Sequence, residues 1–102
     1  MKNFRTYDLA VKLYKEAKKT QIKFAIKDQL LRASSSIALN LAEGNERRGI
    51  KDRMRFFNIA LTSAREVQAI IELEELTELD ELTDKLCAHL YCLNCLNYKT
   101  LK

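Results

Sequence analysis

The apolar residues recur along the chain with the period of an α-helix. Leu9, Leu13 and Ala17 are spaced by four residues, which places them on one face of a helix. The strict alternation of apolar and polar residues that marks a half-buried β-strand is missing. The pattern predicts helices over residues 6–20, 27–43, 51–76 and 79–98. We therefore expect residues 1–102 to form one all-α domain, an antiparallel up-down-up-down four-helix bundle.

Two residues mark the expected helix ends. Thr6 is a suitable N-cap for the first helix, because its hydroxyl can accept a hydrogen bond from a free backbone N–H. Gly44 is expected to end the second helix, because glycine readily adopts the left-handed conformation that closes a helix. The chain contains no proline, and its two glycines, Gly44 and Gly49, are five positions apart. The connection over residues 20–26 has no such marker, and its geometry stays open.

The second helix is apolar over more of its circumference than a monomeric bundle requires. Placed 100° apart, its apolar residues cover more than one side. They are Leu30, Leu31, Ala33, Ile37, Ala38, Leu39, Leu41 and Ala42. Because a helix in an isolated bundle needs only one apolar stripe, the extra width predicts an interface between subunits.

The same helix carries a narrow polar stripe formed by Arg32, Ser36, Asn40 and Glu43. We expect a buried, hydrogen-bonded ladder that fixes the helix register or the joint between subunits. An acid–base role is the alternative, but it needs a substrate pocket and a group that titrates near neutral pH, and the sequence indicates neither. The stripe is therefore interpreted as structural.

Length and cysteine usage narrow the class of protein. A chain of 102 residues is long enough for one hydrophobic core. Its first residues are polar, and no apolar run approaches the roughly 20 residues needed to cross a bilayer. The three cysteines, an odd number, do not suit a paired disulfide framework. We expect a soluble cytoplasmic protein with reduced thiols and no contact with membranes.

The net charge is +4, and the charged residues are distributed unevenly along the chain. Residues 1–55 contain 14 Lys and Arg against 6 Asp and Glu, whereas residues 56–102 contain 4 against 8. Contact between the two halves would neutralise part of this difference, and the excess would leave a positive face open to phosphate groups. An ordinary solvated surface would contain the same residues, so charge alone leaves both interpretations open.

The strongest candidate site is a basic cluster in and after the glycine-bounded turn. It comprises Arg47, Arg48, Lys51, Arg53 and Arg55. Arginine can hold a phosphate through two hydrogen bonds, and an exposed turn can reach a nucleic-acid backbone without reading bases. The alternative is that these cations pair with Glu43, Glu46 and Asp52. A second basic set on the first helix comprises Lys12, Lys15 and Lys19.

Two further constellations resemble catalytic or metal sites only superficially. The serines at 34–36 lie mid-helix, without the base, acid and oxyanion hole that a serine hydrolase needs. Cys87, His89, Cys92 and Cys95 would lie on one continuous helix and cannot converge on a single zinc ion, although ligands from neighbouring subunits could complete such a site. We expect no catalytic residues, no metal and no cofactor.

Part of the chain resembles a known protein family. The resemblance is carried by the run from Asp28 to Gly44, by Phe56, Phe57, Ile59 and Ala60, and by the segment 63–66. These residues are similar to the four-helix-bundle proteins encoded in intervening sequences of 23S ribosomal RNA genes. That family includes the accessory variability determinant of diversity-generating retroelements, a basic partner of a reverse transcriptase. The resemblance implies a homopentameric barrel. The proline that often stands between the first two helices in this family is missing at residues 20–26.

These observations favour a non-enzymatic, sequence-tolerant RNA- or DNA-binding homopentamer. We expect it to be an accessory to a larger ribonucleoprotein process, with a reverse transcriptase as one candidate partner. The alternative is a structural or protein-interaction scaffold whose basic face meets an acidic protein. No aromatic or glycine-rich RNA-binding motif is present, so the sequence gives no preference between RNA and DNA.

Overall fold

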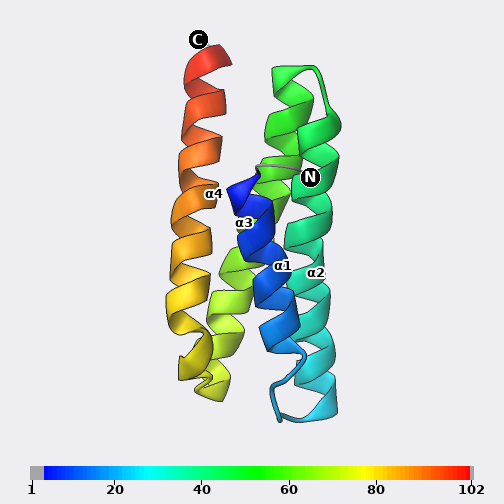
Figure 1. The fold of residues 1–102 in the computed structure, drawn as a ribbon, viewed down its shortest axis with the longest axis vertical. Helices are drawn as coiled ribbons and strands as arrows, with labels where there is room; N and C mark the ends of the chain where they lie inside the picture. Colours follow the sequence, from blue (N-terminus) through cyan, green and yellow to red (C-terminus); the bar gives the residue numbers. More distant parts are fainter. Residues whose placement is uncertain (1–3, 102) are drawn as a thin grey trace.

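The computed structural model describes the backbone of residues 4–101 and side chains up to residue 95. In this range the chain forms α1 (Arg5–Ala17), α2 (Phe24–Glu46), α3 (Ile50–Glu74), the 3₁₀ turn η1 (Thr77–Leu79) and α4 (Asp80–Leu101). No β-strand occurs among these residues. The helices lie side by side along an elongated molecule of 43 × 22 × 21 Å (Figure 1). The prediction of an all-α fold with four helices is confirmed.

The core lies along the common axis, and every helix contributes an apolar stripe to it. Its largest fully buried apolar side chains are Leu13, Leu30, Ile37, Leu41, Val67, Leu79, Leu86 and Leu90. Small residues such as Ala10, Ala60 and Ala64 are completely buried between them. Because burial of apolar surface is the main force that stabilises a fold, these stripes determine which face of each helix turns inward.

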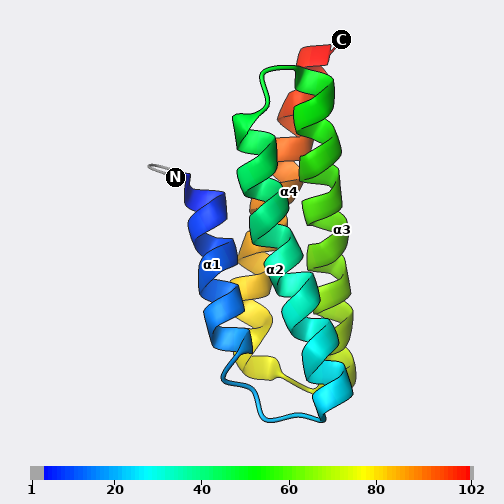
Figure 2. The ribbon, with the colours of Figure 1, turned by 90° about the vertical axis from the view of Figure 1, so that its right-hand side faces the viewer.

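The connections are found at the two ends of the bundle. The α1–α2 connection and η1 lie at one end, whereas the α2–α3 connection lies at the other, near the end of α4 (Figure 2). The α1–α2 connection is held by Thr20, whose hydroxyl donates to Ala17 O at 2.7 Å, and by Lys27, whose Nζ donates to Thr20 O at 2.8 Å. These bonds order a connection that contains neither proline nor glycine.

The expected start and end of the first helix were wrong. The residue preceding α1 is Phe4, and Thr6 lies inside the helix, where it is buried. Its Oγ1 lies 3.5 Å from Nδ1 of His89 on α4. The helix ends at Ala17 rather than at Thr20. Packing of α1 against α4 therefore determines the role of Thr6, and the local capping preference does not.

The expected role of Gly44 was also wrong. α2 continues past Gly44 to Glu46, and neither glycine has a positive φ. The described residue with a left-handed backbone is Glu75, which ends α3 with φ 55° and ψ 43°. A Cβ at Gly44 would lie 2.6 Å from Cε1 of Phe57. Close approach of α3 is thus the reason for glycine at this position.

One flank of α2 remains apolar and uncovered in the single chain. Leu31, Ala38 and Ala42 are half-buried, and Leu39 beyond them is 67% exposed. On a helical projection Leu31, Ala38 and Ala42 lie together beside the core-facing stripe, where Leu31 and Ala38 still contact the core, and Leu39 lies further round the helix beyond Ser35. The extra apolar width expected for this helix is therefore present at the surface of the subunit.

Candidate nucleic-acid interface

The basic cluster is centred on the short connection between α2 and α3. Arg47 and Arg48 lie within it, Gly49 precedes α3, and Lys51, Arg53 and Arg55 follow in the first turns of that helix. The connection is tied at both ends, since Arg47 N–H donates to Gly44 O and Arg53 N–H donates to Gly49 O. The structure thus brings all five predicted residues to one end of the molecule.

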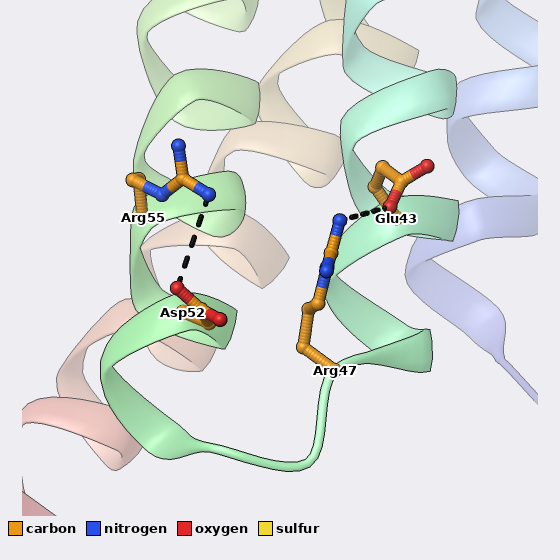
Figure 3. A network of polar contacts seen from close by, with 4 residues as sticks. All are labelled: Glu43, Arg47, Asp52 and Arg55. Atoms are coloured by element: carbon orange, nitrogen blue, oxygen red, sulfur yellow. Dashed lines mark hydrogen bonds and ion pairs between the residues drawn. The ribbon is translucent and has the colours of Figure 1, made fainter.

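Arg47 turns back along α2 rather than out into solvent. Its Nη2 donates to Oε2 of Glu43 at 2.8 Å (Figure 3). In the same way, Arg55 lies 3.8 Å from Oδ1 of Asp52. Glu46 forms no ion pair among the described residues. Two of the three acidic residues considered from the sequence therefore pair with the cluster, and both pairs are largely exposed, so each stabilises the fold only weakly.

The guanidinium groups of Arg47 and Arg55 both lie over the ring of Phe56. The Cζ atoms of Arg47 and Arg55 lie 4.9 and 4.6 Å from the centroid of the Phe56 ring. A guanidinium over an aromatic ring is attracted by the ring quadrupole. In the sequence, Phe56 stands out only as one of the residues shared with the family. The basic residues immediately before it were the available signal, but they could not show that Arg47 reaches the same ring.

Arg53 supports the connection from within. Its Nη2 donates to the carbonyl oxygen of Arg47 at 3.2 Å, and its side chain is half-buried. The Nε atoms of Arg47 and Arg53 are buried and have no hydrogen-bond partner among the residues that the structure describes. Arg53 therefore stabilises the conformation of the connection, and its half-buried guanidinium is less accessible to an external ligand.

Arg48 and Lys51 differ from their neighbours. Both are exposed, and neither forms an ion pair or hydrogen bond with another described residue. They project from a segment whose backbone is held by Arg47 and Arg53. Of the five predicted residues, these two are the most available to an external phosphate.

The lysines predicted on the first helix lie in a separate region. α1 ends close to the opposite end of the bundle from the α2–α3 connection (Figure 2). α2, with its 23 residues, spans roughly 35 Å between these ends. Lys12 and Lys15 are exposed without ion pairs among the described residues, whereas Lys19 pairs with Glu16 at 3.2 Å. The two basic sets do not form a single patch on one subunit.

The polar stripe on α2 does not form the continuous buried ladder that was expected. Arg32 is exposed and pairs with Asp28 at 3.0 Å, and Glu43 belongs to the basic cluster. Only the middle of the stripe connects helices, because Ser63 on α3 donates from its Oγ to Oγ of Ser36 at 2.9 Å. Asn40 donates to the same hydroxyl at 3.1 Å. Salt bridges hold both ends of the stripe at the surface, one to Asp28 on α2 and the other to Arg47 in the α2–α3 connection.

The histidine and cysteines of α4 are spread around the helix. His89 contacts Thr6, Cys87 is half-buried, and Cys92 is exposed. Burial raises the pKa of the Cys87 thiol, the carboxylate of Asp84 raises it further, and Arg65 partly opposes both. No three His, Cys, Asp or Glu side chains within the described part of the chain are placed to hold a metal ion.

No helix in the described range combines the length and apolarity needed to cross a membrane.

Comparison with known proteins assigns the family. The sequence model of the family of 23S rRNA-intervening sequence proteins matches residues 4–93. The chain therefore belongs to the family of 23S rRNA-intervening sequence proteins, as its resemblance implied. No curated protein was found to match this chain.

A solved structure shares this architecture. It is a protein of unknown function from Bacteroides thetaiotaomicron, assigned to the S23 ribosomal protein family. The two sequences are 27% identical, and the alignment covers 96% of this chain and 95% of the other with a TM-score of 0.62. The likeness thus extends over nearly the whole of both chains.

Proposed function

We propose that this protein is a non-enzymatic accessory protein that binds the phosphate backbone of RNA or DNA. The observation that carries the proposal is the pair Arg48 and Lys51, two exposed cations without partners among the described residues. They stand on a connection held by Arg47 and by Arg53. Backbone contacts of this kind give affinity with little dependence on base sequence.

The second part of the proposal is assembly into a homopentamer of antiparallel up-down-up-down bundles. The uncovered apolar flank of α2 supports it, because water contact with Leu39 and its neighbours is unfavourable in an isolated subunit. Five copies of the basic cluster on one particle would act together, since linked binding sites raise the effective concentration of one another. In a ring of five subunits, the combined affinity of the five basic clusters would exceed the affinity of a single cluster.

Membership of the family supports a role beside a larger ribonucleoprotein process, with a reverse transcriptase as a candidate partner. The same basic cluster could instead meet an acidic protein. A binding assay with purified nucleic acid distinguishes the two functions, because only the first requires that the protein binds nucleic acid in the absence of another protein.

Fluorescence anisotropy with single-stranded RNA and DNA over a range of salt concentrations tests the proposal. The double variant Arg48→Ala/Lys51→Ala should bind more weakly, and its salt slope should fall by about 0.7 per lost phosphate contact on single strands. The control variant Lys23→Ala/Arg65→Ala removes the same charge from exposed positions elsewhere and should keep the slope. Absence of binding by the unmodified protein at low salt would favour the protein scaffold, and an unchanged slope in the double variant would exclude the connection as the contact surface.

A further inference from the structure

A second positively charged site lies between α1 and α4, on a part of the molecule that the basic cluster does not include. It is a pocket of about 310 Å³. Its lining residues are Arg5, Asp8, Leu9 and Lys12 from α1 and Lys85 and His89 from α4. Residues more than 70 positions apart in the sequence thus meet in one pocket, which the spacing along either helix could not reveal.

The cations that line this pocket are not held in ion pairs within the described part of the subunit. Arg5, Lys12 and Lys85 form no ion pair with any described residue, although Asp8 lies one helical turn from Lys12. Lys12 and Lys85 also line a neighbouring pocket of about 340 Å³, whose lining includes the carboxylates of Glu16, Glu78 and Glu81. None of these three carboxylates lines the first pocket, so the positive charge is confined to that part of the groove. Cations that border one groove repel each other, and an anion between them would remove that cost.

His89 contributes a donor whose orientation is set by the fold. Its Nδ1 lies 3.5 Å from the hydroxyl of Thr6, which is buried in α1. When that hydroxyl donates to Nδ1, the proton of the neutral ring resides on Nε2, which can then donate to a ligand. The pocket therefore combines three exposed cations with an imidazole nitrogen that can donate a hydrogen bond.

We infer that this pocket binds a phosphomonoester, and that its source is the terminal phosphate of the nucleic acid. Arg5, Lys12 and Lys85 against the single carboxylate of Asp8 leave two positive charges. A phosphomonoester carries about 1.5 to 2 negative charges at pH 7, whereas each phosphate inside a nucleic-acid chain carries one. The charge of the pocket thus matches a chain end better than an internal phosphate.

The apolar part of the lining fits the same ligand. Leu9 is half-buried between the cations and offers a carbon surface to a sugar attached to the phosphate. The assignment of the phosphate to a nucleic-acid end rests on the proposed function. The binding of a phosphomonoester in this pocket does not depend on it. A nucleoside monophosphate offers the same group and is the competing source.

The test compares oligonucleotides of one sequence with a 5′-phosphate, a 3′-phosphate or no terminal phosphate. In anisotropy titrations, the unmodified protein should prefer at least one phosphorylated end by about tenfold, the effect of one hydrogen bond to a charged group. The variant Arg5→Gln/Lys85→Gln should bind all three oligonucleotides equally. The control Lys23→Gln/Arg65→Gln loses the same charge from exposed positions outside the pocket and should keep the preference.

A direct readout is available because His89 is the one histidine of the chain. Its imidazole NMR signals should shift when a phosphorylated oligonucleotide is added, and much less with the hydroxyl-ended oligonucleotide. Adenosine monophosphate is added separately to test the competing source. Circular dichroism of the Arg5→Gln/Lys85→Gln variant should match the unmodified protein, because both side chains are exposed.

Each result decides one point. Equal affinity for all three oligonucleotides, without a shift of His89, overturns the inference while leaving backbone binding by Arg48 and Lys51 intact. A shift by adenosine monophosphate that the pocket variant abolishes, together with equal oligonucleotide affinities, overturns the chain end as the source and assigns the pocket to a free phosphate ester.

Discussion

Gly44 on α2 lies directly against the ring of Phe57 on α3, at a distance that leaves no space for a methyl group. A Cβ at position 44 would lie 2.6 Å from Cε1 and 2.8 Å from Cδ1 of that ring, and 3.1 Å from Cβ of Phe56. The Phe57 ring is buried and also lies 6.2 Å, between ring centroids, from Phe4. This contact fixes the separation of α2 and α3 next to the basic connection.

The substitution Gly44→Ala should therefore destabilise the protein despite the better helix propensity of alanine. Alanine favours a helix by about 1 kcal/mol over glycine, whereas overpacking costs about 1–3 kcal/mol. We expect a lower free energy of unfolding in urea titrations. Gly49→Ala is the steric control, because no described atom lies within 4 Å of its added Cβ. Gly49 is the N-cap of α3, where glycine is preferred over alanine, so we expect a loss of up to about 1 kcal/mol without overpacking. A more stable Gly44→Ala variant would show that the ring can move aside without cost.

The exposed flank of α2 allows a test of assembly. Leu39→Glu places a charge on the proposed subunit interface and should convert the pentamer to smaller species in native mass spectrometry, because a buried unpaired charge is costly. Leu73→Glu is the control, since Leu73 on α3 is 78% exposed and lies outside this flank. A monomer of the unmodified protein at micromolar concentration would contradict assembly altogether.

Thr83 on α4 presents a buried hydroxyl without a partner. Its side chain is 1% exposed, and Oγ1 forms no hydrogen bond with any described residue. Thr83→Val should therefore leave stability unchanged or raise it by up to about 1 kcal/mol, because valine avoids the desolvation cost. Ser34→Ala provides the contrast: its hydroxyl donates to Leu30 O at 2.6 Å, and removal should cost about 1 kcal/mol. Thermal or urea unfolding measures both, and a clear loss of stability in Thr83→Val would reveal a partner for the hydroxyl.

The thiols of α4 should differ in their reactivity with iodoacetamide. The thiolate is the reacting form, and burial together with Asp84 raises the pKa of Cys87, so less of it is ionised near pH 8. Cys92 is exposed and should be modified first. The rate at Cys87 should rise with increasing pH, and Asp84→Asn should accelerate it by removing a negative charge that disfavours the thiolate. Mass spectrometry of peptides gives the order of labelling, and faster labelling of Cys87 than of Cys92 would contradict it.

The sequence by itself determined the helical class, because helical periodicity is a relation between residues three and four positions apart. Leu13, Ile37 and Leu86 belong to stripes of this period, and all three are fully buried. The clustering of Arg48 and Lys51 could likewise be read from the sequence, because the two residues are only three positions apart. The ends of the helices were less certain, since local preferences at Thr6 and Gly44 gave way to contacts with other helices.

Only the tertiary structure decided which residues of different helices meet. The axial offset and rotation of two packed helices depend on side-chain fit along their whole length, and neither can be read from one helix alone. For this reason the contact of Arg47 with Phe56, the bond between Ser36 and Ser63, and the shared pocket of Lys12 and Lys85 appear only when the bundle is assembled. The sequence supplied the charges, and helix packing decided which of them are paired and which remain available to a ligand.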